Sequence, residues 1–303
     1  MNRVQRFLDH FAEHCQVYFP AIEENRRRNE ATFTGLAETL LEWAENYLGE
    51  GWPEVLADGY KFFLMDVNRS QIEYERRGHY LHKSYDQVYQ SVYNDPQCMN
   101  RYHWGVFVST FAWEHHIQIY EFYRDRFLPC LPAGEGGLLD LGCGSGVWSL
   151  LTTHTLPGWT AEGIDISEKS IELSSRMAQA CGMNGRIRFS VGDALTYRSP
   201  SPLNAGISCF LMEHLEAPDR LLHTLAANLS PRGHAFVTAA LTAAEVDHIS
   251  EFRRESEVVR MAEDAGFRVV ALFSAAPPSH PESHRFLPRS LALVLQKRKN
   301  EIW

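Results

Sequence analysis

The sequence predicts an α/β fold, a doubly wound seven-stranded sheet with its last strand antiparallel, preceded by an all-helical N-terminal cap region. From residue 138 onward, short apolar runs alternate with amphipathic segments, a pattern typical of parallel strands flanked by helices. The last two apolar runs are joined by the Pro-rich residues 275–288, a link with no helix in it. Neighbouring strands with such a short connection pair antiparallel. No strand pattern of any length appears before Leu138.

The first 130 residues carry the spacing of helices instead. Apolar residues recur three and four positions apart from Leu36 to Leu48, and the Gly- and Pro-containing residues 49–53 end that pattern. Further helices are expected over about 53–77 and 97–127. We therefore divide the chain into a helical region, residues 1–130, and an α/β domain, residues 131–303.

Within the second domain, each predicted element follows from a run of matching periodicity. Strands are expected near 138–141, 160–165, 187–191, 205–211, 234–240, 268–274 and 289–296, and helices near 147–156, 167–182, 216–229 and 249–266.

Composition restricts the classes of partner. The formal net charge of −9 over 303 residues argues against a general nucleic-acid binder. The N-terminus lacks the apolar run of a signal peptide, and no segment has the roughly 18 apolar residues of a membrane span. The six cysteines show no metal-ligand spacing. We expect a cytoplasmic protein with no membrane or nucleic-acid partner and no metal.

The stretch from Leu138 to Gly146 predicts a ligand site. It contains a short apolar strand, an acidic residue and three glycines on alternate positions, and a helix pattern follows at once. Glycines let the backbone turn sharply and approach a ligand, and the helix start offers free N–H groups. A dinucleotide fingerprint has the spacing G-x-G-x-x-G. This loop is one residue tighter, and its carboxylate would repel pyrophosphate and attract a cationic ligand.

With this loop, the chain resembles the class I S-adenosylmethionine-dependent methyltransferases. The resemblance covers residues 138–296, about half the chain. It implies that the loop binds S-adenosylmethionine, and that S-adenosylhomocysteine is the product. The residues that it assigns to the donor in this loop are Asp140, Gly142, Cys143, Gly144 and Gly146.

The same resemblance assigns the later strand ends. Asp165 would accept the ribose hydroxyls, with Ile166 beside it. Asp193 and Ala194 would meet the adenine edge, and Phe210 would border the transferring methyl group. Each acidic residue also has a simpler interpretation, a helix cap or a plain turn.

The acceptor is expected to be a small molecule from secondary metabolism, covered by the helical region, which would also offer a homodimer interface. Candidate bases are His214, His116 and His103, and candidate acceptor contacts are Met99, Tyr102 and Trp113. For His214 we favour a structural role, a hydrogen bond to the helical cap. His115 and His116 should point about 100° apart on one helix, so that at most one faces the pocket.

Two alternatives stay open at this point. The protein could bind S-adenosylmethionine without catalysis, or it could be a nicotinamide-dependent oxidoreductase on a similar sheet. Asp140 and the seven-strand pattern disfavour the second alternative. The methylated atom, whether O, N, S or C, is not determined by these patterns.

Overall fold

The computed structural model describes residues 2–88, 96–277 and 285–299, and the side chains of all of these except 96–99. The chain before the first strand is helical. Its helices are α1 (Arg3–His14), α2 (Phe19–Arg28), α3 (Glu30–Leu48), α4 (Trp52–Arg77), α5 (Tyr85–Val88), α6 (Pro96–Ala112) and α7 (Glu114–Phe122), with short 3₁₀ or π turns at Gly49–Gly51, Tyr123–Phe127 and Leu128–Cys130.

Local sequence sets the ends of these helices. The side chain of Asn2 accepts a hydrogen bond from the N–H of Gln5 and caps α1. Pro53 occupies the first turn of α4, where a missing N–H costs nothing, and Gly78 ends that helix with a φ of 78°.

The helix expected over 97–127 is in fact interrupted at Trp113. The backbone of this residue is extended, with φ −95° and ψ 130°, and α7 starts directly after it. The Trp113 ring stacks on Phe63 with centroids 5.3 Å apart. Periodicity could not reveal the break because the residues on both sides of it have helical spacing and no proline intervenes.

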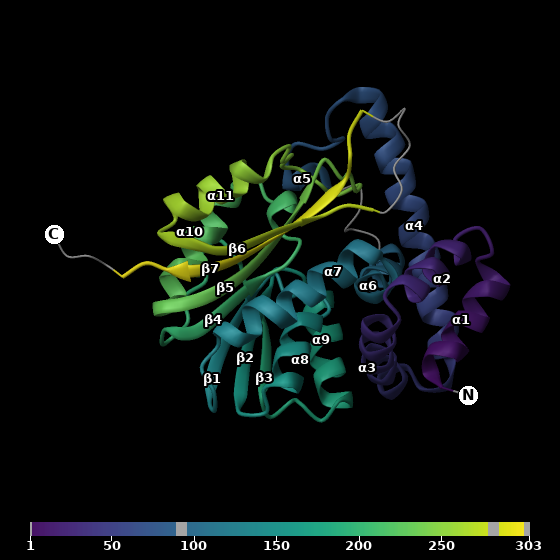
Figure 1. Cartoon of the computed structure of the whole chain (residues 1–303), viewed down its shortest axis with the longest axis horizontal. Coiled ribbons are helices and arrows are strands. Elements are labelled where there is room, and N and C mark those ends of the chain that lie inside the picture. The colour runs from purple at the N-terminus through teal and green to yellow at the C-terminus, as the bar shows by residue number, and fades with distance from the viewer. Residues whose placement is uncertain (1, 89–95, 278–284, 300–303) are drawn as a thin grey trace.

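The seven-stranded sheet confirms the predicted fold class. Its strands are β1 (Gly136–Leu141), β2 (Trp159–Asp165), β3 (Ile187–Val191), β4 (Leu203–Ser208), β5 (Leu229–Leu241), β6 (Phe267–Ala275) and β7 (Arg289–Lys297). The strand order is β3-β2-β1-β4-β5-β7-β6, and β7 pairs antiparallel with both β5 and β6 (Figure 1). All other pairs are parallel.

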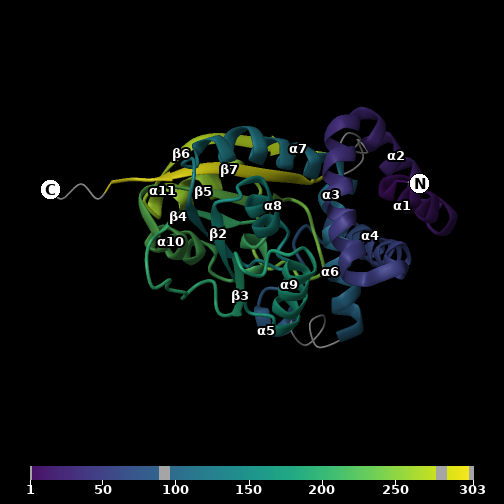
Figure 2. The same cartoon turned by 90° about the horizontal axis from the view of Figure 1, so that it is seen from below.

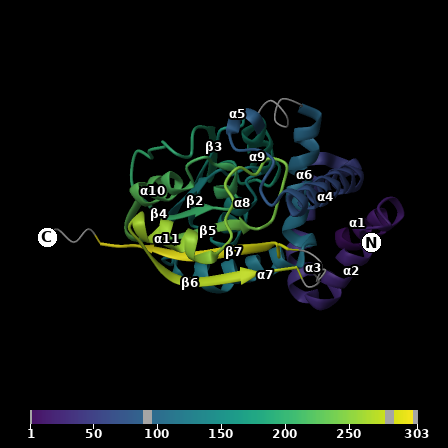
Figure 3. The same ribbon diagram turned by 90° about the horizontal axis from the view of Figure 1, so that it is seen from above.

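Alternate residues of the strands enter two separate cores. Leu138 belongs to the core shared with α7, α8 (Val147–Thr155) and α9 (Glu168–Ala180), whereas Leu139 belongs to the core under α10 (Pro218–Asn228) and α11 (Glu255–Asp264). Figures 2 and 3 show α7 on the face opposite α10 and α11. Because both faces of the sheet are buried, the strands are apolar along nearly their whole length.

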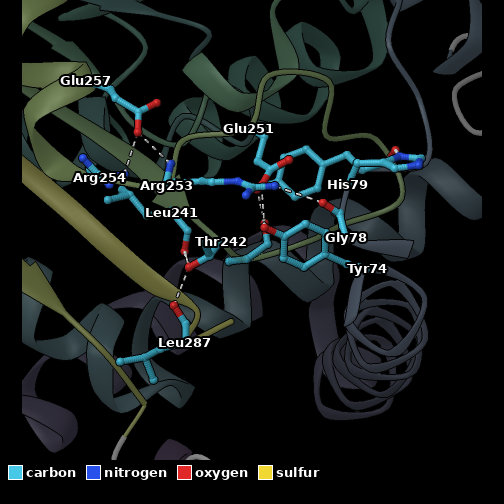
Figure 4. A network of polar contacts seen from close by, with 12 residues as sticks. Tyr74, Gly78, His79, Leu241, Thr242, Glu251, Arg253, Arg254, Glu257 and Leu287 are labelled. Atoms are coloured by element: carbon cyan, nitrogen blue, oxygen red, sulfur yellow. Dashed lines mark hydrogen bonds and ion pairs between the residues drawn. The ribbon is translucent and has the colours of Figure 1, made fainter. Parts of the chain in front are cut away.

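Helices α1 to α4 gather at one end of the sheet, opposite the C-terminal end of the chain (Figure 1). Their apolar residues continue the core on the α8 and α9 side of the sheet. Polar contacts tie α4 to the loop after β5: Gln71 accepts a hydrogen bond from the N–H of Ala244 at 2.9 Å, and Tyr74 donates one to Glu251 at 2.6 Å (Figure 4). The helical region therefore covers the edge of the sheet where parallel strands end.

In the part of the chain that the structure describes, no helix combines the length and the apolarity needed to cross a bilayer.

Candidate functional site

A cavity of about 920 Å³ lies between the carboxyl ends of the strands and the helical region. Open α/β sheets place their ligands at this edge. Its walls come from the glycine loop, from the ends of β2 to β5 and from helices α4 to α7. Of the residues predicted for the site, the cavity is lined by Gly142, Cys143, Gly144, Asp165, Ile166, Asp193, Ala194, Phe210, His214, His116, His103, Tyr102 and Trp113.

The glycine loop has the backbone geometry that its sequence predicts. Gly142, Gly144 and Gly146 all have positive φ, at 73°, 51° and 76°. A Cβ on Gly146 would lie 2.6 Å from Phe189, so this glycine serves packing and does not itself line the cavity. A Cβ on Gly144 would meet no protein atom within 4 Å. Gly144 is thus the point where the backbone lies open to a ligand.

Asp165 ends β2 and links this loop to the next helix. One carboxylate oxygen accepts a hydrogen bond from the N–H of Gly144 at 2.9 Å, and the other accepts one from the N–H of Ser167 at 2.9 Å. Burial raises the pKa of Asp165, and the two backbone donors oppose that rise. The side chain of Ser167 caps α9. Asp165 is therefore held rigidly at the cavity wall with acceptor capacity left for a diol.

Asp193 lies in a turn and on the cavity wall at once. Its carboxylate accepts hydrogen bonds from the N–H of Leu195 at 2.8 Å and from the hydroxyl of Thr196 at 3.1 Å. This is the turn chemistry of the simpler interpretation. Ala194, next to it, also lines the cavity. The turn and the ligand-binding interpretations are compatible, because the same carboxylate can serve both.

Asp140 departs from the prediction. It is 2% exposed and lies outside the residues that line the cavity. Its carboxylate accepts a hydrogen bond from the Ser149 hydroxyl at 2.7 Å. Burial raises the pKa of Asp140 to about 7, although that hydrogen bond opposes the rise. The expected direct contact with the donor is therefore corrected: Asp140 supports the loop from below by accepting from α8.

Phe210 follows β4 with a φ of 51°, a conformation that a bulky residue rarely adopts. Its N–H donates to the hydroxyl of Thr238 on β5 at 2.8 Å, which holds this conformation. The ring stacks on His116 with centroids 4.9 Å apart. Phe210, which has this strained backbone conformation, thus lies between the strand ends and the helical wall of the cavity.

The helical side of the cavity is aromatic and rich in histidine. Phe63, Trp113, His115 and His116 all line it. The expectation that at most one of the two adjacent histidines faces the pocket is wrong. Because α7 begins at Glu114, both lie in its first turn, and their rings pack around Trp113 at 5.0 and 4.8 Å.

Two of the candidate bases are held by neighbours. Nε2 of His103 lies 2.9 Å from the Ser170 hydroxyl, and Nδ1 of His116 lies 3.2 Å from the Ser109 carbonyl oxygen. Burial lowers the pKa of His103 to about 4 and that of His116 well below its ordinary value. Both imidazoles are therefore neutral at pH 7. Met99 lies outside the residues whose side chains are described.

Among the contacts that the structure describes, His214 binds the loop after β5, and its expected hydrogen bond to the helical cap stays a prediction. Its Nδ1 lies 3.3 Å from the Asp247 carbonyl oxygen and 3.4 Å from the Asp247 carboxylate. Burial disfavours the imidazolium, but the charges of Asp247 and Glu213 outweigh burial and raise the pKa of His214. A histidine oriented by a carboxylate can move a proton.

The sequence analysis did not identify the cavity-lining residues that surround His214. Glu245, Asp247 and His248 follow β5 and line the same wall as Glu213 and His214. Tyr102 donates a hydrogen bond to Glu245 at 2.8 Å, so the helical region also reaches this corner. The available signal was an acidic and histidine-containing run directly after a predicted strand, at the edge where ligands bind.

Comparison with known proteins agrees with this geometry. Residues 138–233 match the family model described as "Methyltransferase domain". The chain is 31% identical over 100 residues to a ubiquinone biosynthesis O-methyltransferase of Caulobacter vibrioides, a match covering 33% of this chain and 39% of that protein. It is 37% identical over 114 residues to the methyltransferase ungE' of Aspergillus campestris, covering 34% and 33%. The matched segment thus spans between a third and two fifths of these relatives.

Solved structures share the fold at low identity. A putative sarcosine dimethylglycine methyltransferase from Galdieria sulphuraria has a TM-score of 0.51 at 13% identity, covering 60% of this chain and 85% of that one. The [4+2]-cyclase SpnF also has a TM-score of 0.51, at 16% identity, and the match covers 80% of this chain and 97% of the SpnF chain. The resemblance expected from the motifs is confirmed, but a shared fold does not fix the reaction.

Proposed function

We propose, on the premise that residues 138–233 form a class I S-adenosylmethionine-dependent methyltransferase domain, that this protein methylates a small molecule. The acceptor, a metabolite or natural product, would lie beneath the helical region and receive the methyl group by in-line displacement. The observation that carries the proposal is one continuous cavity with the glycine loop and Asp165 on one wall and the aromatic helices on the other.

The donor side fits S-adenosylmethionine. Gly144 leaves space where any other residue would place a Cβ, and Asp165 beside it can accept both ribose hydroxyls. Bound there, the donor would supply a methyl group made electrophilic by its sulfonium. Phe210 and His116 lie close to that side, and aromatic faces attract a cation by roughly 0.5–2 kcal/mol.

The acceptor side favours a molecule of modest size. A cavity of about 920 Å³ is near the upper end of the roughly 300–1,000 Å³ typical of small-molecule sites. The cover formed by α4 to α7 would exclude water and fix the acceptor against the methyl group, which is most of what this reaction requires. His214 and His116 remain the candidate bases. His103 is less suited because its Nε2 is already bound to Ser170.

Calorimetric titration with S-adenosylhomocysteine and with NAD tests the proposal. S-adenosylhomocysteine should bind, and Asp165→Ala should weaken that binding by about 1–3 kcal/mol because a charged acceptor is lost. Asp219→Ala removes an exposed carboxylate in the first turn of α10 and is the matched control. Tight binding of NAD with no response to S-adenosylhomocysteine would overturn the proposal.

Transfer itself needs a second measurement, because a protein that binds the donor without catalysis would pass the first. Formation of S-adenosylhomocysteine from S-adenosylmethionine should depend on an added acceptor. Screening hydroxyl, amine and thiol acceptors of small size would then identify the methylated atom. Donor binding with no transfer to any of these classes would favour the non-catalytic alternative.

A further inference from the structure

One corner of the cavity holds five ionisable side chains to which the proposed function assigns no donor contact. Glu213 and His214 lie in the short 3₁₀ turn after β4, and Glu245, Asp247 and His248 lie in the loop after β5. We refer to these five residues as the carboxylate–histidine cluster. All five line the cavity.

The cluster has the spacing of a metal site. One potential ligand atom from each of Glu213, His214 and His248 lies within 4.8 Å of the others, and the same is true of Glu245, Asp247 and His248. Two adjacent strand ends of a parallel sheet bring these groups together, although about 30 residues separate them in the chain. Small side-chain rotations would close such a group around an ion.

Burial makes the negative charge of the cluster costly. Glu213 and Asp247 are each 1% exposed, and His248 is 2% exposed. Buried carboxylates are normally paired or bound to a metal ion. Among the described contacts, the Asp247 carboxylate faces the imidazole of His214. Arg289 also lines the cavity, but the ion pair that it forms is with Glu255, outside the cluster.

An independent observation points to a ligand. The Oε2 atom of Glu213 is fully buried and has no hydrogen-bond partner among the described residues. Leaving a buried carboxylate oxygen unsatisfied is expensive, so such an atom in a native structure calls for a partner. Because Glu213 borders the cavity, that partner can be a bound cation.

Both histidines have Nδ1 held by an oxygen acceptor. Nδ1 of His248 lies 2.8 Å from the Ala243 carbonyl oxygen, which only accepts, so Nδ1 carries the proton and Nε2 keeps its lone pair. Nδ1 of His214 likewise faces the carbonyl and carboxylate oxygens of Asp247. Metal-binding histidines typically donate their other ring N–H to such an acceptor, which fixes the ring and the tautomer.

We propose that Glu213, His214 and His248 bind a divalent metal ion, with Glu245 and Asp247 adding negative charge around it. Two imidazoles and a carboxylate favour zinc, cobalt, iron or manganese over magnesium and calcium, which prefer oxygen ligands. The open side of the site faces the cavity. The role of the ion rests on the proposed function: it would hold an acceptor oxygen and polarise it next to the donor. A metal-bound His214 would leave His116 as the base.

Metal titration of the full chain tests this inference. After treatment with a chelator and its removal, the protein is titrated with Zn²⁺, Co²⁺, Mn²⁺ and Mg²⁺ by calorimetry, and Co²⁺ binding is followed by visible absorption. We expect one Co²⁺ or Zn²⁺ per chain, with at least tenfold weaker binding of Mg²⁺. Glu213→Gln and His248→Gln should each weaken Co²⁺ binding at least tenfold.

His103→Gln is the matched control, because it removes an imidazole from the same cavity but outside the cluster. It should leave Co²⁺ affinity unchanged. No Co²⁺ or Zn²⁺ binding by the unsubstituted chain would overturn the inference, as would equal losses in all three variants. S-adenosylhomocysteine is titrated against the same preparation. Donor binding without metal binding refutes the metal site alone, whereas metal binding without donor binding refutes the proposed function alone.

Discussion

The two halves of the cavity are built in different ways. The half proposed to bind the donor, here the donor half, depends on backbone: three positive φ angles in five residues, and a carboxylate that accepts a hydrogen bond from the N–H of Gly144. The half proposed to bind the acceptor, here the acceptor half, depends on side chains from α4, α6, α7 and the loops after β4 and β5. Backbone requirements leave a short, local sequence pattern. A cavity wall assembled from side chains that are distant in the sequence leaves no such pattern. The residues of such a wall can be replaced, and the ligand it binds can change, while the fold stays the same.

The substitution Gly144→Val should have the largest effect, and of the two ligand sites it should affect only the proposed donor site. The added side chain would meet no protein atom near its Cβ and would project into the space proposed for the donor. We expect affinity for S-adenosylhomocysteine, measured by calorimetry, to fall at least 100-fold, which corresponds to about 2.7 kcal/mol.

The matched control is Gly182→Val. Gly182 also has positive φ, at 68°, and open space around its Cβ, but it lies outside the cavity residues. Both variants place a β-branched residue at positive φ, a backbone strain of about 1–2 kcal/mol, so we expect similar shifts in thermal unfolding. Equal donor affinity in the two variants would mean that Gly144 does not contact the donor.

The same contrast explains what the sequence could predict. Alternating strand and helix patterns were sufficient for the sheet, because burial on both faces requires continuous apolar strands. The positions of Asp165 and Asp193 at strand ends followed from the order of the motifs. Asp140 has a similar sequence context, but it lies inside β1 and is buried, and its carboxylate accepts from the Ser149 hydroxyl of α8, a contact that no strand pattern encodes.

The acceptor half could not be predicted to the same depth. Trp113 interrupts a helical pattern, and its ring stacks on Phe63 of α4, a residue 50 positions away in the chain. The carboxylate–histidine cluster joins the ends of β4 and β5, so neither segment shows metal-ligand spacing by itself. The expectation of no metal was drawn from local spacing, which cannot detect such a site.

The buried position of Asp140, unlike the cavity-wall position of Asp165 and Asp193, can be tested by the pH dependence of the unfolding free energy. The pKa of Asp140 is about 7 in the folded chain, against an ordinary 3.8, so the folded state holds a proton that the unfolded state releases between these values. Stability from this group is thus complete below pH 4 and is lost as the pH rises to 7. Relative to Asp140→Asn, which stays neutral, the native chain should lose about 1.4 kcal/mol of unfolding free energy per pH unit.

Urea unfolding of both chains between pH 4.5 and 8 gives the measurement. Titrating groups that do not interact with Asp140 cancel in the difference between the two chains, whereas Asp165, whose charge helps to raise the pKa of Asp140, contributes to that difference. The difference should become constant above about pH 8. Parallel stability curves at all pH values would show that Asp140 is ionised in the folded chain.

The smallest expected effect concerns the junction between the two halves. Tyr74 at the end of α4 donates a hydrogen bond to Glu251 after β5, and Arg253 binds both Glu251 and the carbonyl oxygen of Gly78 (Figure 4). Tyr197 makes the same kind of hydrogen bond, to Glu162, but entirely within the sheet domain. Tyr74→Phe and Tyr197→Phe should each cost about 1 kcal/mol of unfolding free energy.

Only Tyr74→Phe should loosen the cover of the cavity. Losing about 1 kcal/mol at the junction would raise the population in which α4 is detached from the β5 loop roughly fivefold. Amide exchange near Gln71 and at the last turn of α4 should accelerate by that factor in Tyr74→Phe and stay unchanged in Tyr197→Phe. If both variants left this exchange unchanged, the helical region and the sheet domain would open only together, and the acceptor half would be as rigid as the donor half.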